Sequence, residues 1–131
     1  MKNYKLTIED GVITWVENAD ENGNPIEGIL YIPKEAVGFH PDAWIFLGCD
    51  ADGIVVDEEN LVFSSAHNCL LSKDGKTLIK GCPTSVIPQG VTTIGEGAFC
   101  GMNIIAPFFF LPEGLKEIGH MAFYGCTNLY Q

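Results

Sequence analysis

The chain has 131 residues, a typical length for one domain with a modest hydrophobic core. It carries 17 acidic residues against seven lysines and no arginine, so its formal net charge is −10. Residues 1–60 hold thirteen of the acids and three of the lysines, whereas residues 61–131 hold four of each. Because the positive charge that neutralises phosphate groups is missing, nucleic acids and anionic membranes are not expected partners. No apolar run is long enough to insert into a membrane.

The first predicted element is a β-hairpin in YKLTIEDGVITWV, around Asp10-Gly11. An Asp-Gly pair favours a tight turn because both residues tolerate a positive φ. We expect this hairpin and the loop up to residue 28 to cap the first layer of the fold. The start of the chain lacks the apolar segment of a secretory signal, so as written the chain is expected to stay in the cytoplasm.

The loop ENADENGNPIEG suggests a calcium site only weakly. Asn18, Asp20 and Asn22 alternate as oxygen ligands before the turn glycine Gly23, as in an EF-hand loop. However, Ile29 stands where that loop needs a bidentate glutamate, and the flanking segments are predicted strands. An Asn-Gly turn explains the loop better, and a weak calcium-binding module remains an alternative.

Four short β-rich runs follow, three of which end at a proline, and we predict that they lie side by side in one parallel sheet. Proline lacks the N–H group that a strand ladder needs, so a strand ends there. The predicted strands are Ile29–Ile32, Gly53–Val56, Thr84–Ile87 and Phe108–Leu111, with ends spaced by 24, 31 and 24 residues. The inward residues predicted are Ile32, Val56, Ile87 and Leu111.

The segments IPQGVTTIGEGAFCGM and LPEGLKEIGHMAFYGC repeat one another at an offset of 24 residues. The two segments have identical residues at seven positions, from Pro88 and Pro112 to Gly101 and Gly125. A third, less similar copy begins at Pro33. A period of this length is typical of solenoids, whose units bury their apolar faces by stacking. Each EGAFCG or HMAFYG piece is expected to form about one helical turn. Trp44, Phe99 and Phe123 would stack in the wall opposite the sheet.

One unit departs from the repeat pattern between residues 57 and 83. Its segment CLLSKDGKTLIK predicts an inserted β-hairpin near residues 69–80, around Asp74-Gly75. The insertion accounts for the seven extra residues in the spacing of the strands.

The two copies resemble the BspA-type bacterial leucine-rich repeats, a family built on IPxGVTxIGxxAFxGC. The likeness extends to TIEDGVITWVENADENGNPIEGILYIP and to DEENLVFSSAHNCLLSKDGKTLIKGCP, which is similar to the hairpin insertion of that family. It implies an α/β fold: a short right-handed leucine-rich repeat solenoid, mostly β with short helical turns and a parallel sheet. Residues 1–131 would form a single domain, with about four solenoid turns in residues 29–131. The family implies protein binding, commonly in adhesion at bacterial surfaces.

Apart from the weak calcium pattern in ENADENGNPIEG, nothing in the sequence predicts catalysis, a cofactor or a metal. Nucleophile-elbow, Walker and Rossmann patterns are absent, and no motif places a base beside a serine. The five cysteines are odd in number, lie far apart and form no C-x-x-C pair. We therefore expect small buried thiols rather than ligands, and a chain that is not an enzyme.

The predicted function is recognition of a protein partner through the open face of the sheet. Strand side chains alternate between two faces, so the residues predicted to point outward are Tyr31, Val55, Val86, Phe108 and Phe110. An alternative is that such residues merely suit strands. A structural role at one end of a larger repeat assembly also remains open. The edge of Phe108–Leu111 lacks a predicted cap, which favours a homodimer or further repeats there.

Overall fold

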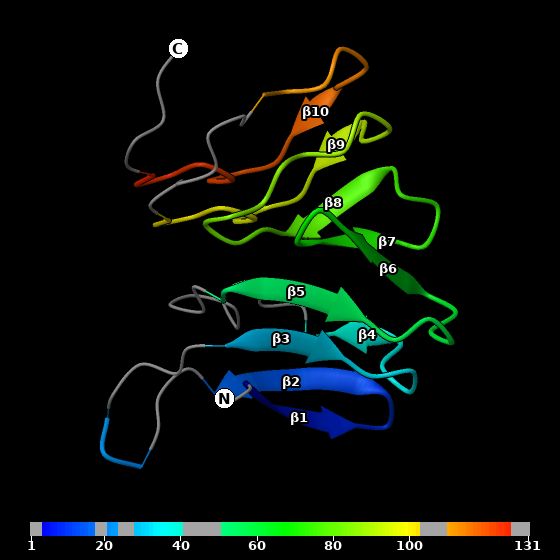
Figure 1. The fold of residues 1–131 in the computed structure, drawn as a ribbon, viewed down its shortest axis with the longest axis vertical. Coiled ribbons are helices and arrows are strands. Elements are labelled where there is room, and N and C mark those ends of the chain that lie inside the picture. The colour runs from blue at the N-terminus through cyan, green and yellow to red at the C-terminus, as the bar shows by residue number, and fades with distance from the viewer. Residues whose placement is uncertain (1–3, 18–20, 24–27, 41–50, 103–109, 127–131) are drawn as a thin grey trace.

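The computed structural model describes residues 4–17, 21–23, 28–40, 51–102 and 110–126. These residues form the strands β1 (Lys5–Glu9), β2 (Val12–Glu17), β3 (Ile29–Ile32), β4 (Gly38–Phe39), β5 (Gly53–Val56), β6 (Phe63–Ala66), β7 (Cys69–Ser72), β8 (Thr77–Lys80), β9 (Thr93–Ile94) and β10 (Glu117–Ile118). The strands stack broadly in chain order along the long axis of the molecule (Figure 1). They form three sheets, ordered β1-β2-β4, β3-β5 and β10-β9-β8-β7-β6.

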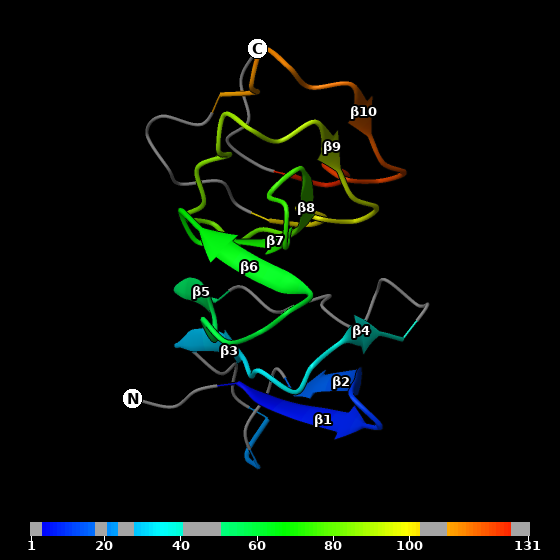
Figure 2. The same ribbon diagram turned by 90° about the vertical axis from the view of Figure 1, so that its right-hand side faces the viewer.

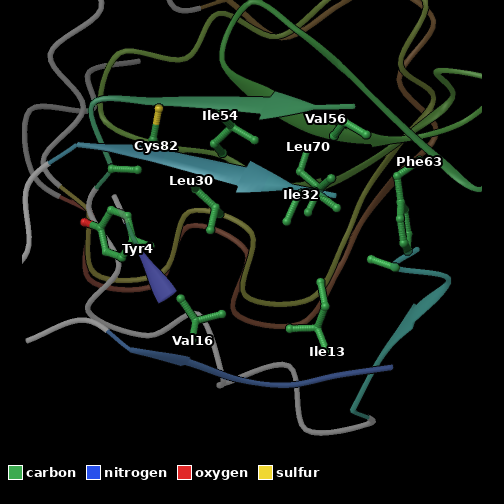
Figure 3. Close-up of a cluster of buried hydrophobic side chains, with 12 residues drawn as sticks. Tyr4, Ile13, Val16, Leu30, Ile32, Ile54, Val56, Phe63, Leu70 and Cys82 are labelled. Carbon is green, nitrogen blue, oxygen red and sulfur yellow. The ribbon is translucent and has the colours of Figure 1, made fainter. Parts of the chain in front are cut away.

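The stack has two walls. β3 and β5 lie on one side, and β4, β9 and β10 lie on the other (Figure 2). Buried side chains from both walls and from the hairpins fill the space between them in two clusters, the first of which appears in Figure 3.

The first layer is the antiparallel hairpin of β1 and β2. Asp10 and Gly11 connect the strands with φ values of 52° and 80°, the positive values that the Asp-Gly pair favours. Ile13 and Val16 of β2 are buried in the core (Figure 3). β2 also pairs in parallel with β4, which joins the hairpin to the first repeat unit.

β3 and β5 form a parallel pair over the residues that the sequence predicted. The register joins residues 24 apart, from Ile29 with Gly53 to Ile32 with Val56. Leu30, Ile32, Ile54 and Val56 are buried (Figure 3), whereas Tyr31 and Val55 are exposed. One face of this sheet therefore covers the core and the other faces solvent.

The prediction of four strands in one parallel sheet is wrong beyond this pair. Thr84–Ile87 forms no strand, and neither do Phe110 and Leu111, while residues 103–109 lie outside the described part of the chain. A two-residue turn, His67 and Asn68, lies beside β5, where the third parallel strand was predicted, and the side chain of Asn68 packs against Gly53. The N–H of Val56 donates to Ser65 Oγ at 2.9 Å, and the N–H of Val86 donates to the His67 carbonyl at 3.2 Å.

The turn belongs to an antiparallel meander of β6, β7 and β8. His67 and Asn68 have φ values of 52° and 63°, as the tightest hairpin turns require. The second turn contains Asp74 and Gly75, where the sequence placed an inserted hairpin. β8 then pairs in parallel with β9, so the meander rejoins the stack on the opposite wall.

The 24-residue repeat forms its ladder on that opposite wall. β9 and β10 pair in parallel through Thr93 with Glu117 and Ile94 with Ile118. These residues belong to the VTTIG and LKEIG pieces rather than to the runs before the prolines. A period read from sequence thus predicts that the units stack, while the segments that pair depend on which neighbours lie alongside.

The expected helical turns are also wrong, because the described residues contain no helix. Backbone N–H groups of the EGAFCG segment donate to the next layer instead. Gly97 donates to the carbonyl of His120, Phe99 to that of Ala122 and Gly101 to that of Tyr124, at 2.7–3.0 Å. Gly97 and Gly101 have positive φ values of 65° and 71°, which a right-handed helix does not accept. Successive tight turns therefore replace the helical turn.

Aromatic side chains join the layers at the repeat spacing. The rings of Phe99 and Phe123 stack with centroids 5.3 Å apart, as the sequence predicted, and those of Phe39 and Phe63 pack tilted at 4.8 Å. Both pairs are 24 residues apart, and Trp44 lies outside the described residues. Of the predicted inward residues, Ile32, Val56 and Ile87 are buried.

The prediction that Leu111 points inward is wrong, because this residue is 51% exposed. Each layer of a stack is covered by the one after it, and Leu111 lies in the last described layer. The same trend appears in the ladder, where Ile94 is fully buried and Ile118 is 51% exposed.

We predict that replacing Gly101 with alanine lowers the free energy of unfolding by about 1 to 2 kcal/mol. A Cβ at Gly101 would meet no atom of the described residues within 4 Å, so the loss is expected to come from the positive φ. Gly90→Ala is the matched control, because its Cβ would also lie in open space and its φ is not in the left-handed range. Equal urea midpoints for the two variants would contradict this account of the turn.

Candidate functional site

The candidate site lies on the outer face of the β3–β5 sheet, which we call the Tyr31 face. Tyr31 and Val55 are direct register partners in the parallel ladder, and their side chains are 42% and 45% exposed. Their neighbours Leu30, Ile32 and Ile54 point into the core (Figure 3). Alternation along two adjacent strands thus places an aromatic and an aliphatic side chain side by side in solvent.

A hydrogen bond ties Tyr31 to the next layer. Its hydroxyl donates to Oδ2 of Asp57 at 2.6 Å, while Oδ1 of Asp57 accepts the N–H of Glu59 at 2.8 Å. The bond to Asp57 raises the pKa of Tyr31, and the same bond holds the pKa of Asp57 below its usual value. Asp57 is therefore ionised at neutral pH, and its carboxylate holds the Tyr31 ring in place on the sheet.

Two stacked turns border the Tyr31 face at the carboxyl ends of β3 and β5, which lie on the same side of the molecule (Figure 1). They span residues 33–36 and 57–60 and are closed by the N–H of Ala36 donating to the Pro33 carbonyl and that of Asn60 to the Asp57 carbonyl. Together these turns contain four carboxylates and one lysine. The carboxylates, which we call the acidic rim, are Glu35, Asp57, Glu58 and Glu59.

Charge on the acidic rim is only partly compensated. The ammonium group of Lys34 lies 3.6 Å from a carboxylate oxygen of Glu59. Both side chains are exposed, so the pair is screened by water and holds the rim weakly. With one lysine against four carboxylates, the two turns carry a net charge of −3.

Asn60 holds the two turns of the acidic rim together, and the sequence analysis missed it. The side chain is fully buried. Its amide group donates to the carbonyls of Pro33 and Ala36, both at 2.9 Å, and its carbonyl oxygen accepts the N–H groups of Val62 and Phe63, both at 2.8 Å. The sequence did contain a signal for Asn60. The equivalent positions in the other repeat copies hold the apolar residues Ala36, Val91 and Leu115, so a polar residue here is unusual.

The remaining predicted contact residues are not joined to this face by a continuous ladder. Val86 is half-buried, and the turn at His67 separates it from Val55. The His67 side chain in this turn is exposed. Phe110 is exposed but lies in no strand, and Phe108 falls outside the described residues. The structure therefore brings together Tyr31 and Val55, with Asp57 as the added partner.

The four cysteines in the described ranges show no sign of a reactive or metal-binding site, and Cys49 lies outside those ranges. Cys69, Cys82, Cys100 and Cys126 are free thiols, the first two buried as predicted and the last two half-buried. Burial raises the pKa of the Cys69 thiol to about 12, so this thiol is a poor nucleophile. Within the described ranges, no three histidine, cysteine or acidic side chains gather around one point. Most of the loop weighed as a calcium site lies outside those ranges.

No helix in the described ranges has the length and apolar character to cross a membrane. No family model matches the chain, and neither does any curated protein.

Two solved structures share the fold. The pneumococcal vaccine antigen PcpA aligns over 82% of this chain with 23% sequence identity and a TM-score of 0.69. A leucine-rich repeat protein from Eubacterium ventriosum aligns over 77% with 20% identity and a TM-score of 0.65. The chain has a leucine-rich-repeat-like fold. It spans about a quarter of each of these proteins, 27% and 28% of their lengths.

Proposed function

We propose that the chain is a non-catalytic protein-recognition module and that its partner binds on the Tyr31 face. The observation that carries the proposal is the pair of Tyr31 and Val55, which are exposed next to each other on a sheet whose other face is buried. Neighbouring apolar side chains on an open surface are typical of interaction sites, and tyrosine is among the residues that contribute most to binding. The parallel ladder of β3 and β5 presents the two side chains next to each other.

The surroundings of the described serines support a role without catalysis. Ser65 accepts the N–H of Val56, Ser85 donates to the Asn68 carbonyl at 2.5 Å, and Ser64 donates to the Ser72 carbonyl at 2.8 Å. A nucleophilic serine needs a base beside its hydroxyl. Here these three hydroxyl groups join strands and turns instead. The fourth described serine, Ser72, donates to Oδ1 of Asp74 at 2.7 Å and accepts the N–H of Thr77 at 3.0 Å, and both bonds lie within the turn between β7 and β8.

The resemblance of IPQGVTTIGEGAFCGM and LPEGLKEIGHMAFYGC to the BspA-type repeats supports a finer proposal. It would make the chain part of an adhesion protein that presents its Tyr31 face to a protein of another cell. A second candidate function is assembly with further repeats or with a second copy of the chain. The greater exposure of Ile118 compared with Ile94 favours it, and the edge concerned would be β10 rather than Phe108–Leu111.

Selection of random peptides displayed on phage tests the proposed function without assuming a partner. We expect clones enriched on the wild-type protein to lose about tenfold or more in affinity for the variant Tyr31→Ser/Val55→Ser, because hot-spot truncations cost about 2 kcal/mol or more. Val37→Ser is the matched control, since Val37 is exposed but lies outside both strands of the face. Failure to enrich any clone, or unchanged binding to the double variant, would refute the proposed function.

A further inference from the structure

We infer that the Tyr31 face selects a basic peptide segment of its partner and stacks a guanidinium group on the Tyr31 ring, where this group also donates to the Asp57 carboxylate. This inference rests on the proposed function and names the class of partner. The occupant we propose is an extended segment with arginine next to an apolar residue.

The charge around Tyr31 favours a basic occupant. Asp57, Glu35 and Glu59 all act electrostatically on the Tyr31 hydroxyl. Asp52 extends the negative charge to the opposite end of β5, where its exposed side chain directly precedes the strand. A ligand on this face therefore lies between carboxylates at both ends of β5, and an acidic ligand would be repelled.

The carboxylate of Asp57 can accept further hydrogen bonds. Each of its oxygens accepts one described hydrogen bond, from the Tyr31 hydroxyl and from the Glu59 N–H, and an ionised carboxylate offers about four acceptor positions in all. An incoming guanidinium group can donate to the positions left over. The bond from Tyr31 holds the carboxylate in place before the ligand arrives, so little ordering is needed on binding.

The aromatic ring next to this carboxylate favours arginine over lysine. A planar guanidinium group stacks on a tyrosine face and donates sideways to a carboxylate at the same time. A lysine ammonium group is a compact charge without this flat shape. Val55 adds an apolar contact one strand away, so an apolar residue beside the arginine completes the fit.

Fluorescence anisotropy with three short labelled peptides tests the inference. All three have blocked ends and contain leucine at every second position. The other positions hold arginine in the first peptide, lysine in the second and glutamate in the third. We expect the arginine peptide to bind about tenfold more tightly than the glutamate peptide and more tightly than the lysine peptide. Binding should weaken at high salt, because exposed charges are screened.

Two variants with the same change in net charge separate the site from the overall charge of the chain. Asp57→Asn is expected to weaken arginine-peptide binding at least about tenfold, the lower end of what a hydrogen bond to a charged group contributes. Glu117→Gln removes a carboxylate on β10 and should leave binding unchanged, as that residue lies on the opposite wall (Figure 2). Equal losses in the two variants, or equal affinities for the arginine and glutamate peptides, would overturn the inference.

The phage selection distinguishes failure of the inference from failure of the proposed function. Enriched clones rich in arginine that depend on both Tyr31 and Asp57 would support both. Clones that depend on Tyr31 and Val55 but carry no basic residue would leave the proposed function standing and overturn the basic partner. Clones that bind both the wild type and the face variants equally would refute the proposed function itself.

Discussion

Replacing Phe99 with alanine is expected to lower the free energy of unfolding by about 3 to 5 kcal/mol. The Phe99 ring is fully buried, stacks on Phe123 and fills the space above Gly81, where a Cβ atom would overlap it. Removal of the ring leaves a cavity between two layers that are held together by backbone hydrogen bonds, so the walls collapse only partly. Urea denaturation followed by circular dichroism measures the loss.

Phe123→Ala is the matched control for this prediction. Phe123 occupies the equivalent position one repeat later and is half-buried, so its removal frees less buried area. We expect a loss about half as large, since transfer energies scale with the area removed from water. If Phe99→Ala unfolds at the wild-type urea concentration, or if the order of the two losses is reversed, the layered packing described here is wrong.

Replacing Asn60 with alanine is expected to cost about 3 to 5 kcal/mol, because four backbone groups each lose a hydrogen bond, although the Pro33 carbonyl keeps the N–H of Ala36. The carbonyls of Pro33 and Ala36 and the N–H groups of Val62 and Phe63 would be left without the Asn60 amide. Each buried unpaired group costs about 1 to 3 kcal/mol, although some would reach water after local relaxation. Glu58→Ala, an exposed neighbour in the same turn, should stay within about 0.5 kcal/mol of the wild type.

Asn60→Asp gives an independent readout of the same contacts through pH. One oxygen of the new carboxyl group would face two carbonyl oxygens in a buried site, while the other would accept the N–H groups of Val62 and Phe63. Burial and the carbonyls raise the folded-state pKa more than the two N–H groups lower it, so it would lie above the unfolded value of about 3.9. A group with a raised folded-state pKa adds stability that is fully present below the unfolded pKa and is lost as the pH rises through the folded pKa. Relative to the wild type, the variant should lose stability from about pH 4 upward. A difference that does not change with pH would contradict the assigned contacts.

The first two parallel strands could be predicted from the sequence with their observed ends. Ile29–Ile32 and Gly53–Val56 are short β-rich runs 24 residues apart, and their pairing needs no information about other segments. The turns at Asp10-Gly11 and Asp74-Gly75 were equally readable, because glycine identifies the positions where φ is positive. Stacking of Phe99 on Phe123 followed from the repeat period alone.

The third predicted strand failed for a reason that its own residues do not contain. Thr84–Ile87 has a composition suited to a strand, but a strand exists only through a partner that offers a free edge. The edge of β5 is taken by Ser65, which accepts the N–H of Val56, and by Asn68, whose side chain lies against Gly53. The turn at His67 and Asn68 lacks glycine. Histidine and asparagine accept positive φ values more readily than most residues, but they give a weaker turn signal than the two Asp-Gly pairs.

Part of the candidate site could be predicted from the sequence. Alternation identified Tyr31 and Val55 as outward residues, because side chains on a strand face opposite sides at successive positions. Asp57 follows β5 in sequence, but its bond to Tyr31 crosses 26 residues and depends on the parallel register. Asn60, which holds the acidic rim, differed from its repeat equivalents only in polarity.

The sequence by itself determined the 24-residue period, the apolar faces of β3 and β5 and the acidic character of the turns after them. These properties depend on the types of side chain at regular spacings. Such patterns are local, because each one extends over only a few residues. Only the tertiary structure decided which backbone groups pair, that tight turns replace the helical turns, and that the ladder of the two clear repeats runs through β9 and β10. A backbone N–H or carbonyl is the same in every residue, so its partner depends on which segments lie alongside once the layers have stacked.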